Sequence, residues 1–121
     1  MSFKILYVTA TMQEADILRK IEGIIPVHDK FCSGRLEIDL LVAGVGSMST
    51  AWSMTQWISA NEKPSLAING GIAGSYNDAF PCGSVVMPVT DCFADAGIED
   101  GDNFLTLHET GLTNPDEFPF R

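Results

Sequence analysis

Glu14 is the acidic residue whose position in the chain best suits it to chemistry. It follows an apolar segment, residues 3–8, by a few positions, and a carboxylate in the first helical turn after a strand could face a strand-end pocket and take a proton from water. Glu14 also stands three residues after Thr11, the spacing of a capping box, where it would only accept a hydrogen bond from the Thr11 backbone N–H. The spacing leaves both roles open.

Glycine and small polar residues follow three apolar segments, at residues 9–14, 44–47 and 69–74. In parallel sheets, ligands bind at the carboxyl ends of the strands, where glycine lets the backbone approach and helix N-termini offer free N–H groups. A tight turn explains any single glycine, but three such segments together predict one wall of a small-molecule pocket. The candidate binding residues are Thr11, Gly44, Gly46, Asn69, Gly70, Gly71, Ile72, Ala73 and Gly74.

Cofactor and nucleotide motifs are incomplete. Gly44-Val45-Gly46 resembles the start of a dinucleotide fingerprint, but Ser49 stands at the third glycine position and the next strand ends in Asn69 instead of an acid. The Gly-Lys-Ser/Thr of a phosphate-binding loop is absent from the sequence. A phospho-receiver domain would need acids where Thr11 and Asn69 stand. We therefore expect no cofactor.

Metal, disulfide and nucleic-acid roles are disfavoured by composition. Cys32, Cys82 and Cys92 are an odd number without C-x-x-C spacing, and His28 and His108 are far apart in the sequence. The two histidines are expected in surface or loop positions, and no metal site is expected. The formal net charge of −9 would repel a phosphate backbone, so nucleic acid is not an expected partner.

The elements that would position these residues alternate between strands and helices. We predict a strand over residues 3–9, a helix to Glu22, a strand over 27–31, a turn at Ser33-Gly34 and a strand over 36–43. A helix then follows from Met48 to Asn61, with strands over 65–69 and 84–89, and the tail from Asp95 reads as irregular. This order predicts a single α/β domain over residues 1–121 with a mixed, mainly parallel sheet.

The chain has the apolar content of a folded domain without a membrane segment. It has 121 residues, 45% of them hydrophobic, and its longest apolar stretches, such as residues 40–45, are much shorter than the ~20 residues of a membrane-spanning helix. The N-terminus leads directly into a predicted strand and has no signal-peptide pattern. We expect a cytoplasmic protein with no membrane partner.

In order along the chain, the segments resemble the nucleoside phosphorylase and nucleosidase superfamily, and within it most closely futalosine hydrolase of menaquinone biosynthesis. The motifs that carry the resemblance are Ile-Leu-Tyr-Val-Thr-Ala-Thr at 5–11 with Glu14, Ala-Gly-Val-Gly at 43–46, Asn-Gly-Gly-Ile-Ala-Gly-Ser at 69–75 and Phe-Ala-Asp-Ala-Gly-Ile-Glu-Asp-Gly at 93–101. The last motif is the one that favours futalosine hydrolase.

The resemblance implies a three-layer α/β/α sandwich that cleaves the N-glycosidic bond of a purine nucleoside, with hypoxanthine as the base released from futalosine. Glu14 matches the glutamate that activates the attacking water, and the glycines of residues 70–74 would line the ribose and water side. Phosphorylases of the superfamily have an arginine where Asn69 stands and a serine where Ile72 stands, so water is the expected nucleophile. A dimer or larger homo-oligomer is also implied.

Three other readings remain open at this point: a purine nucleoside phosphorylase, a nucleosidase for methylthioadenosine or adenosylhomocysteine, and a non-catalytic α/β binding or assembly module. The resemblance covers only the first half of the family's pattern. The family's ribose-binding glutamate and its general-acid aspartate would lie after Arg121. The resemblance thus implies that a polypeptide ending at Arg121 is an N-terminal part of the fold and is inactive.

Overall fold

The computed structural model describes residues 2–91, 93–114 and 116–117, so Cys92 lies outside the described residues. The chain divides into two compact units, Met1–Tyr76 and Asn77–Arg121. Each unit is described by itself.

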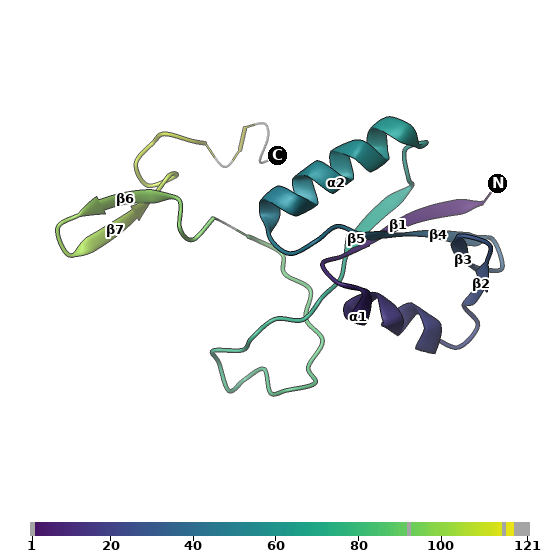
Figure 1. Cartoon of the computed structure of the whole chain (residues 1–121). Coiled ribbons are helices and arrows are strands. Elements are labelled where there is room, and N and C mark those ends of the chain that lie inside the picture. Colours follow the sequence, from purple (N-terminus) through teal and green to yellow (C-terminus); the bar gives the residue numbers. More distant parts are fainter. Residues whose placement is uncertain (1, 92, 115, 118–121) are drawn as a thin grey trace. The chain divides into compact units, whose positions relative to one another are not determined.

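The first unit is an α/β fold built on a five-stranded mixed sheet (Figure 1). Its elements are β1 (Phe3–Thr9), α1 (Met12–Ala15), the 3-10 helix η1 (Asp16–Lys20), β2 (Ile25–Val27), β3 (Lys30–Ser33), β4 (Leu36–Val42), α2 (Ser47–Ala60) and β5 (Leu66–Asn69). The strand order is β2-β3-β4-β1-β5. Strand β1 pairs in parallel with β4 and β5, whereas β2, β3 and β4 pair antiparallel. The fold class expected from the sequence is confirmed.

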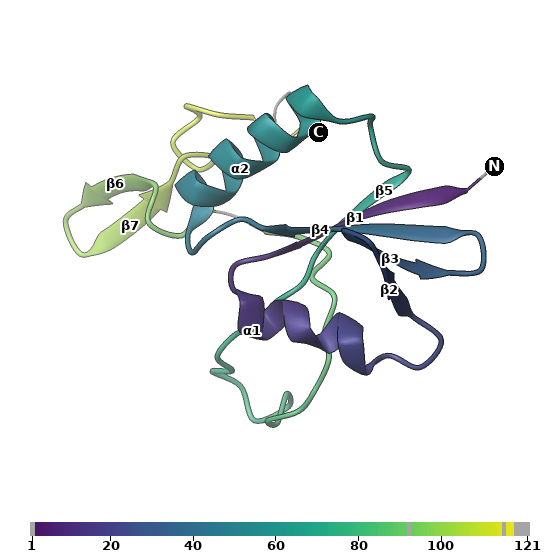
Figure 2. The same cartoon turned by 45° about the vertical axis from the view of Figure 1, so that its right-hand side comes forward.

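Helices cover both faces of this sheet: α2 lies on one face, and α1 with η1 on the other (Figures 1 and 2). Alternate residues of a strand point to opposite faces, and the core accordingly has two parts. Leu6 and Val8 of β1 pack with Ala43, Met54 and Trp57 on the α2 side. On the other side, Leu18, Phe31 and Ile38 form a second buried cluster, with Ile5 and Tyr7 packed against it.

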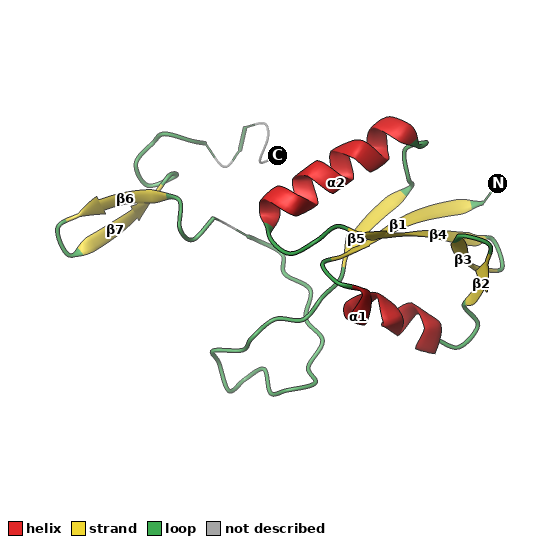
Figure 3. Cartoon of the chain, in the orientation of Figure 1, coloured by secondary structure: helices red, strands yellow, loops and turns green. Residues whose placement is uncertain are grey.

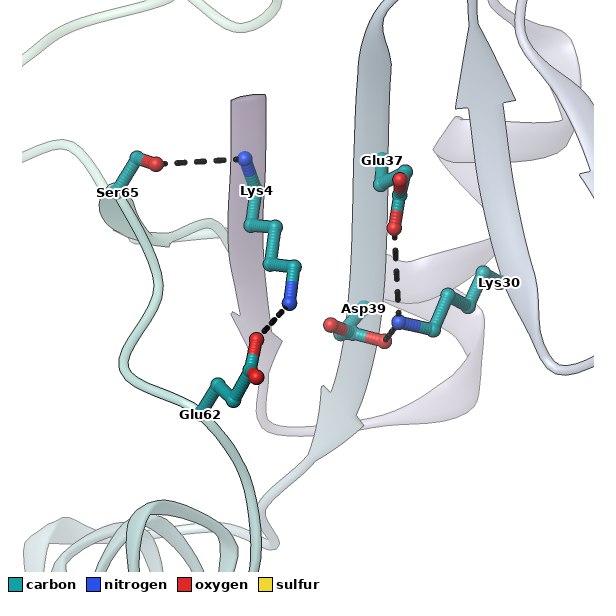
Figure 4. A network of polar contacts seen from close by, with 6 residues as sticks. All are labelled: Lys4, Lys30, Glu37, Asp39, Glu62 and Ser65. Atoms are coloured by element: carbon teal, nitrogen blue, oxygen red, sulfur yellow. Dashed lines mark hydrogen bonds and ion pairs between the residues drawn. The ribbon is translucent and has the colours of Figure 1, made fainter. Parts of the chain in front are cut away.

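Charged side chains form ion pairs on and beside strands β1, β3 and β4 (Figure 4). Lys4 of β1 pairs with Glu62 of the α2–β5 connection, and Lys30 Nζ lies 3.3 Å from Asp39 Oδ1 and 3.8 Å from Glu37 Oε2. Solvent reaches these side chains, so each pair contributes little to stability. Lys4 thus connects β1 with the α2–β5 connection, and Lys30 separately connects β3 with β4.

The predicted helix after β1 is shorter than expected. Only Met12–Ala15 is α-helical, and a 3-10 helix continues to Lys20 instead of an α-helix running to Glu22. The tighter 3-10 winding places Leu18 in the core, while Ile17 and Ile21 remain 47% and 43% exposed. Of the three apolar residues Ile17, Leu18 and Ile21 in this segment, only Leu18 is therefore buried.

The strand predicted over residues 27–31 is wrong, because the chain turns inside it. His28 has a φ of 57°, in the left-handed region, between β2 and β3. These strands pair with each other through Val27 and Lys30. A three-stranded antiparallel meander results, with Gly34 at its second turn.

The second unit contains a hairpin, β6 (Gly97–Asp100) and β7 (Asn103–Thr106), in the tail that was expected to be irregular. The strand predicted over residues 84–89 is wrong. Figure 3 shows neither helix nor strand among the described residues between β5 and β6. No strand in either described sheet pairs with this segment, and Val85 and Val89 are accordingly 98% and 88% exposed.

Candidate active site

The carboxyl ends of three parallel strands lie at one edge of the sheet. Thr9, the last residue of β1, stands opposite Val42 of β4, and Val8 stands opposite Asn69 of β5. Backbone hydrogen bonds continue past the strand ends, from Ala43 N–H to the Thr9 carbonyl at 2.8 Å and from Gly70 N–H to the Val8 carbonyl at 2.9 Å. The connections after β1, β4 and β5 therefore start side by side, as the sequence predicted.

The Glu14 carboxylate uses its two oxygens differently. Oε2 accepts hydrogen bonds from the Thr11 backbone N–H at 2.9 Å and from Thr11 Oγ1 at 3.0 Å, and Glu14 N–H donates to Thr11 Oγ1 at 3.3 Å, which completes a capping box. Oε1 accepts a hydrogen bond from Ile72 N–H at 3.1 Å. The sequence left a capping role and a role at the strand ends as alternatives; the carboxylate both caps the helix and contacts the loop at the carboxyl end of β5.

Thr9 fixes the start of helix α1 and was missed by the sequence analysis. It is fully buried, and its hydroxyl donates a hydrogen bond to the Thr11 carbonyl at 3.1 Å. A threonine closing a strand just before a Thr-x-x-Glu capping box is a signal that could have identified it. The bond sets the direction in which the chain leaves β1 toward Glu14.

The loop after β5 approaches Glu14 closely because Gly71 has no side chain. A Cβ at Gly71 would lie 2.9 Å from Glu14 Oε1, closer than ordinary van der Waals contact. Gly70 is equally constrained, since a Cβ there would overlap the phenol of Tyr7. A side chain at either position would therefore force Glu14, Tyr7 or the loop to shift from the arrangement in which Ile72 N–H bonds to Glu14.

Hydrogen bonding lowers the pKa of Glu14 below its ordinary value. The Ile72 N–H is the largest cause, followed by the Thr11 hydroxyl, while partial desolvation acts in the opposite direction. Glu14 is therefore ionised at neutral pH. An ionised carboxylate oxygen has about two acceptor sites, and within the described residues Oε1 accepts one hydrogen bond from a donor in the loop. Oε1 can thus accept a further proton or hydrogen bond from a small molecule.

Gly44 and Gly46 shape the connection between β4 and α2. Their φ angles are +89° and +92°, a region that residues with a side chain rarely adopt. A Cβ at Gly44 would lie 3.1 Å from Ser49 Cβ, and the Gly46 carbonyl accepts a hydrogen bond from Thr50 N–H at 3.1 Å in the first turn of α2. These contacts give both glycines a structural role at the start of α2.

The remaining candidates are open to solvent. Asn69 is exposed at the end of β5, and Ala73 and Gly74 are exposed in the loop that follows. Ile72 is 90% exposed, so it reaches Glu14 through its backbone N–H and not through its side chain. The structure therefore joins Thr11, Glu14, Gly71 and Ile72 in direct contact, with the other candidates along the same edge.

Two general features of the described residues bear on the class of site. They contain no group of three or more His, Cys, Asp or Glu side chains placed to hold a metal ion. They also contain no helix long and apolar enough to cross a membrane.

The chain is similar to the 5′-methylthioadenosine/S-adenosylhomocysteine nucleosidase of Buchnera aphidicola subsp. Schizaphis graminum (strain Sg). The two are 35% identical over 65 residues, which are 53% of this chain and 27% of the relative, so the match spans about a quarter of the relative's length. No protein-family model and no solved structure matches the chain. The similarity supports a relation to the nucleoside phosphorylase and nucleosidase superfamily, without bearing on futalosine hydrolase in particular.

Proposed function

We propose that this chain forms part of a hydrolase that cleaves the N-glycosidic bond of a purine nucleoside, with Glu14 as the general base. The observation that carries the proposal is the position of the Glu14 carboxylate, held between the N-cap of α1 and the glycine loop at the carboxyl ends of β1, β4 and β5. The similarity to a nucleosidase supports the same class of reaction.

In this reaction, water attacks the anomeric carbon as the bond to the base breaks. The bonding electron pair leaves with the purine, which takes up a proton, and the sugar passes through an oxocarbenium-like state. Glu14 Oε1 accepts the proton that the attacking water loses, so the products are the free base and the ribosyl sugar. A carboxylate with a lowered pKa is a weak base, and a weak base suffices because the cationic carbon is a strong electrophile.

Residue types at the strand end favour water over phosphate as the nucleophile. Asn69 offers an amide, and Ile72 offers an apolar side chain that is 90% exposed. A phosphate dianion is bound most strongly by charge-assisted donors such as arginine, which neither residue supplies. We therefore propose hydrolysis and not phosphorolysis.

The proposed substrates are adenosine nucleosides with a 5′-thio substituent, because the similar protein is named for methylthioadenosine and adenosylhomocysteine. Futalosine is the second candidate, and the observation in its favour is the segment from Phe93 to Gly101, which resembles futalosine hydrolase. Its residues 97–100 form β6 of the second unit.

The test measures base release by the full product of the natural reading frame. Methylthioadenosine, adenosylhomocysteine and futalosine are each supplied with and without phosphate in ¹⁸O-labelled water, and free adenine or hypoxanthine is quantified by chromatography. The proposal predicts phosphate-independent release with one ¹⁸O in the sugar product. Release that requires phosphate would establish a phosphorylase instead, and no release from any of the three would favour a binding or assembly module.

A further inference from the structure

Tyr7 lies beneath the loop that carries the Ile72 amide. A Cβ at Gly70 would overlap the Tyr7 hydroxyl and would lie 2.7 Å and 2.8 Å from ring atoms Cζ and Cε2, so the phenol rests directly against the Gly70 backbone. A Cβ at the next residue, Gly71, would lie 2.9 Å from Glu14 Oε1. Gly70 therefore packs against the Tyr7 side chain of β1, and Gly71 packs against the Glu14 side chain of α1.

The Tyr7 ring has little freedom to move away. Its backbone lies in the middle of β1, paired with Leu40 of β4 and Ile68 of β5. Its side chain packs against the buried cluster that includes Leu18 and Phe31. The ring is therefore a firm support anchored in the sheet and in the core.

The loop above the ring needs such a support. Gly70 is tied to the sheet by its N–H bond to the Val8 carbonyl, and Ile72 is tied to Glu14 by its own N–H. Between these two bonds lie the Gly70–Gly71 peptide units, and glycine has more backbone freedom than any other residue. Contact with the ring restricts that freedom and favours the conformation in which Ile72 N–H meets the carboxylate.

We propose that Tyr7 is a positioning residue of the candidate active site, whose phenol ring holds the Gly70–Gly71 backbone so that Ile72 N–H reaches Glu14 Oε1. The catalytic consequence rests on the function proposed above, whereas the positioning itself is measurable without any substrate. A purely structural role in the core would change the stability of the fold and leave the titration of Glu14 as it is.

The first test follows Glu14 and Ile72 by NMR in the wild-type protein and in Tyr7→Leu, which removes the ring. We expect the pKa of Glu14, read from its side-chain carboxyl ¹³C shift, to rise toward the ordinary value, because the largest cause of its lowering is lost. Hydrogen exchange of the Ile72 amide should accelerate about tenfold, the order expected for losing one hydrogen bond to a charged group. Tyr7→Phe, which keeps the ring, should change both readouts much less.

The control is Trp57→Leu, an aromatic-to-leucine change in the core cluster on the other face of the sheet, which does not include Tyr7. It should lower stability without moving either readout. Gly70→Ala provides a second route that leaves the core intact, since the added Cβ separates the loop from the ring, and it should shift Glu14 in the same direction as Tyr7→Leu. The proposal is overturned if Gly70→Ala leaves Glu14 and Ile72 unchanged, or if Trp57→Leu shifts them as much as Tyr7→Leu does.

Kinetics separate this proposal from the proposed function. If the protein hydrolyses purine nucleosides, Tyr7→Leu should lower kcat more than it raises KM and move the acid limb of the pH–rate profile upward. If the NMR shifts appear but no nucleoside is cleaved, Tyr7 positions Glu14 as described and the hydrolase proposal fails.

Discussion

The two carboxylate oxygens of Glu14 connect the N-cap of α1 with the loop after β5. Glu109 provides a comparison for this arrangement. Glu109 forms the same local motif with Thr106: its Oε2 accepts hydrogen bonds from Thr106 N–H at 2.9 Å and Thr106 Oγ1 at 2.8 Å. Within the described residues, Glu109 bonds only to this threonine, whereas Glu14 also bonds to Ile72 of a glycine loop. A comparison of Glu14 with Glu109 therefore distinguishes the effect of hydrogen bonds to the preceding threonine from the effect of the additional bond to Ile72.

Glu14 should make stability depend on pH in a defined direction. Its pKa is lower in the folded protein than in the unfolded chain, so its contribution is present above the ordinary glutamate value and is lost as pH falls through the folded value. The difference in unfolding free energy between wild type and Glu14→Gln should therefore decrease between about pH 6 and pH 3, measured by urea unfolding. A difference that stays constant, or grows, as pH falls would contradict the hydrogen bonding described for Glu14.

Gly71→Ala tests the close approach of the loop to the carboxylate. The new Cβ would lie 2.9 Å from Glu14 Oε1, so the loop or the carboxylate must shift, and we expect this shift to disturb the hydrogen bond to Ile72. We expect nucleoside cleavage to fall about tenfold or more, since misplacing a catalytic group by about 1 Å has a large effect on rate. The control for activity is Gly34→Ala in the β3–β4 turn, at the other end of β4 from the site, where an added Cβ meets nothing within 4 Å. Equal activity in the two variants would contradict the role given to Gly71.

Among the elements, the connection from β4 to α2 depends most on backbone conformation. Gly46→Ala introduces a side chain at a φ of +92° with no steric contact within 4 Å, so its effect measures backbone strain alone. We expect a loss of about 1–2 kcal/mol of unfolding free energy in chemical denaturation. Gly74→Ala should stay within about 0.5 kcal/mol of wild type, and a Gly46→Ala protein as stable as wild type would show that the connection adopts another conformation.

The elements with strong periodicity could be predicted from the sequence. Strand β1 was expected with the bounds that it has, and β4, α2 and β5 within one residue at each end. The meander was less predictable, because the turn at His28 uses a left-handed residue that is not glycine. The segment over residues 84–89 has strand-like composition, but a strand needs a neighbour, and composition does not reveal one.

The β6–β7 hairpin carried a signal that was not used. Gly101 and Asp102 are the two loop residues between the paired Asp100 and Asn103, and a Gly-Asp pair between two strand-like segments is a local indication of a hairpin. At the site, the Thr-x-x-Glu spacing and the glycine motif identified Glu14 and its loop. The contact of Tyr7 with Gly70 could not be read from the sequence, since it depends on the register between β1 and β5.

For the molecule as a whole, the division into two units predicts where a protease cuts. The segment between β5 and β6 has few backbone hydrogen bonds, and Tyr76 and Phe80 are 106% and 50% exposed. Segments of this kind unfold locally at low free-energy cost. Brief chymotrypsin treatment of the 121-residue polypeptide should therefore cleave first after Tyr76, as identified by mass spectrometry, because proline follows Phe80 and protects that bond. First cleavage within β1 or β4 would contradict the assignment of the sheet as the stable part.

The central claim is that Glu14 is the base of a nucleoside hydrolase, and the rate of base release from methylthioadenosine tests it most directly. The full product of the natural reading frame is compared with Glu14→Gln and with Glu109→Gln, which loses the same hydrogen bonds to a threonine three residues earlier, in a turn of the second unit. We predict that Glu14→Gln lowers kcat by roughly 10²–10⁴-fold, the usual contribution of a general base, while Glu109→Gln stays within about twofold of wild type. Undiminished release by Glu14→Gln, or an equal loss in both variants, would contradict the account.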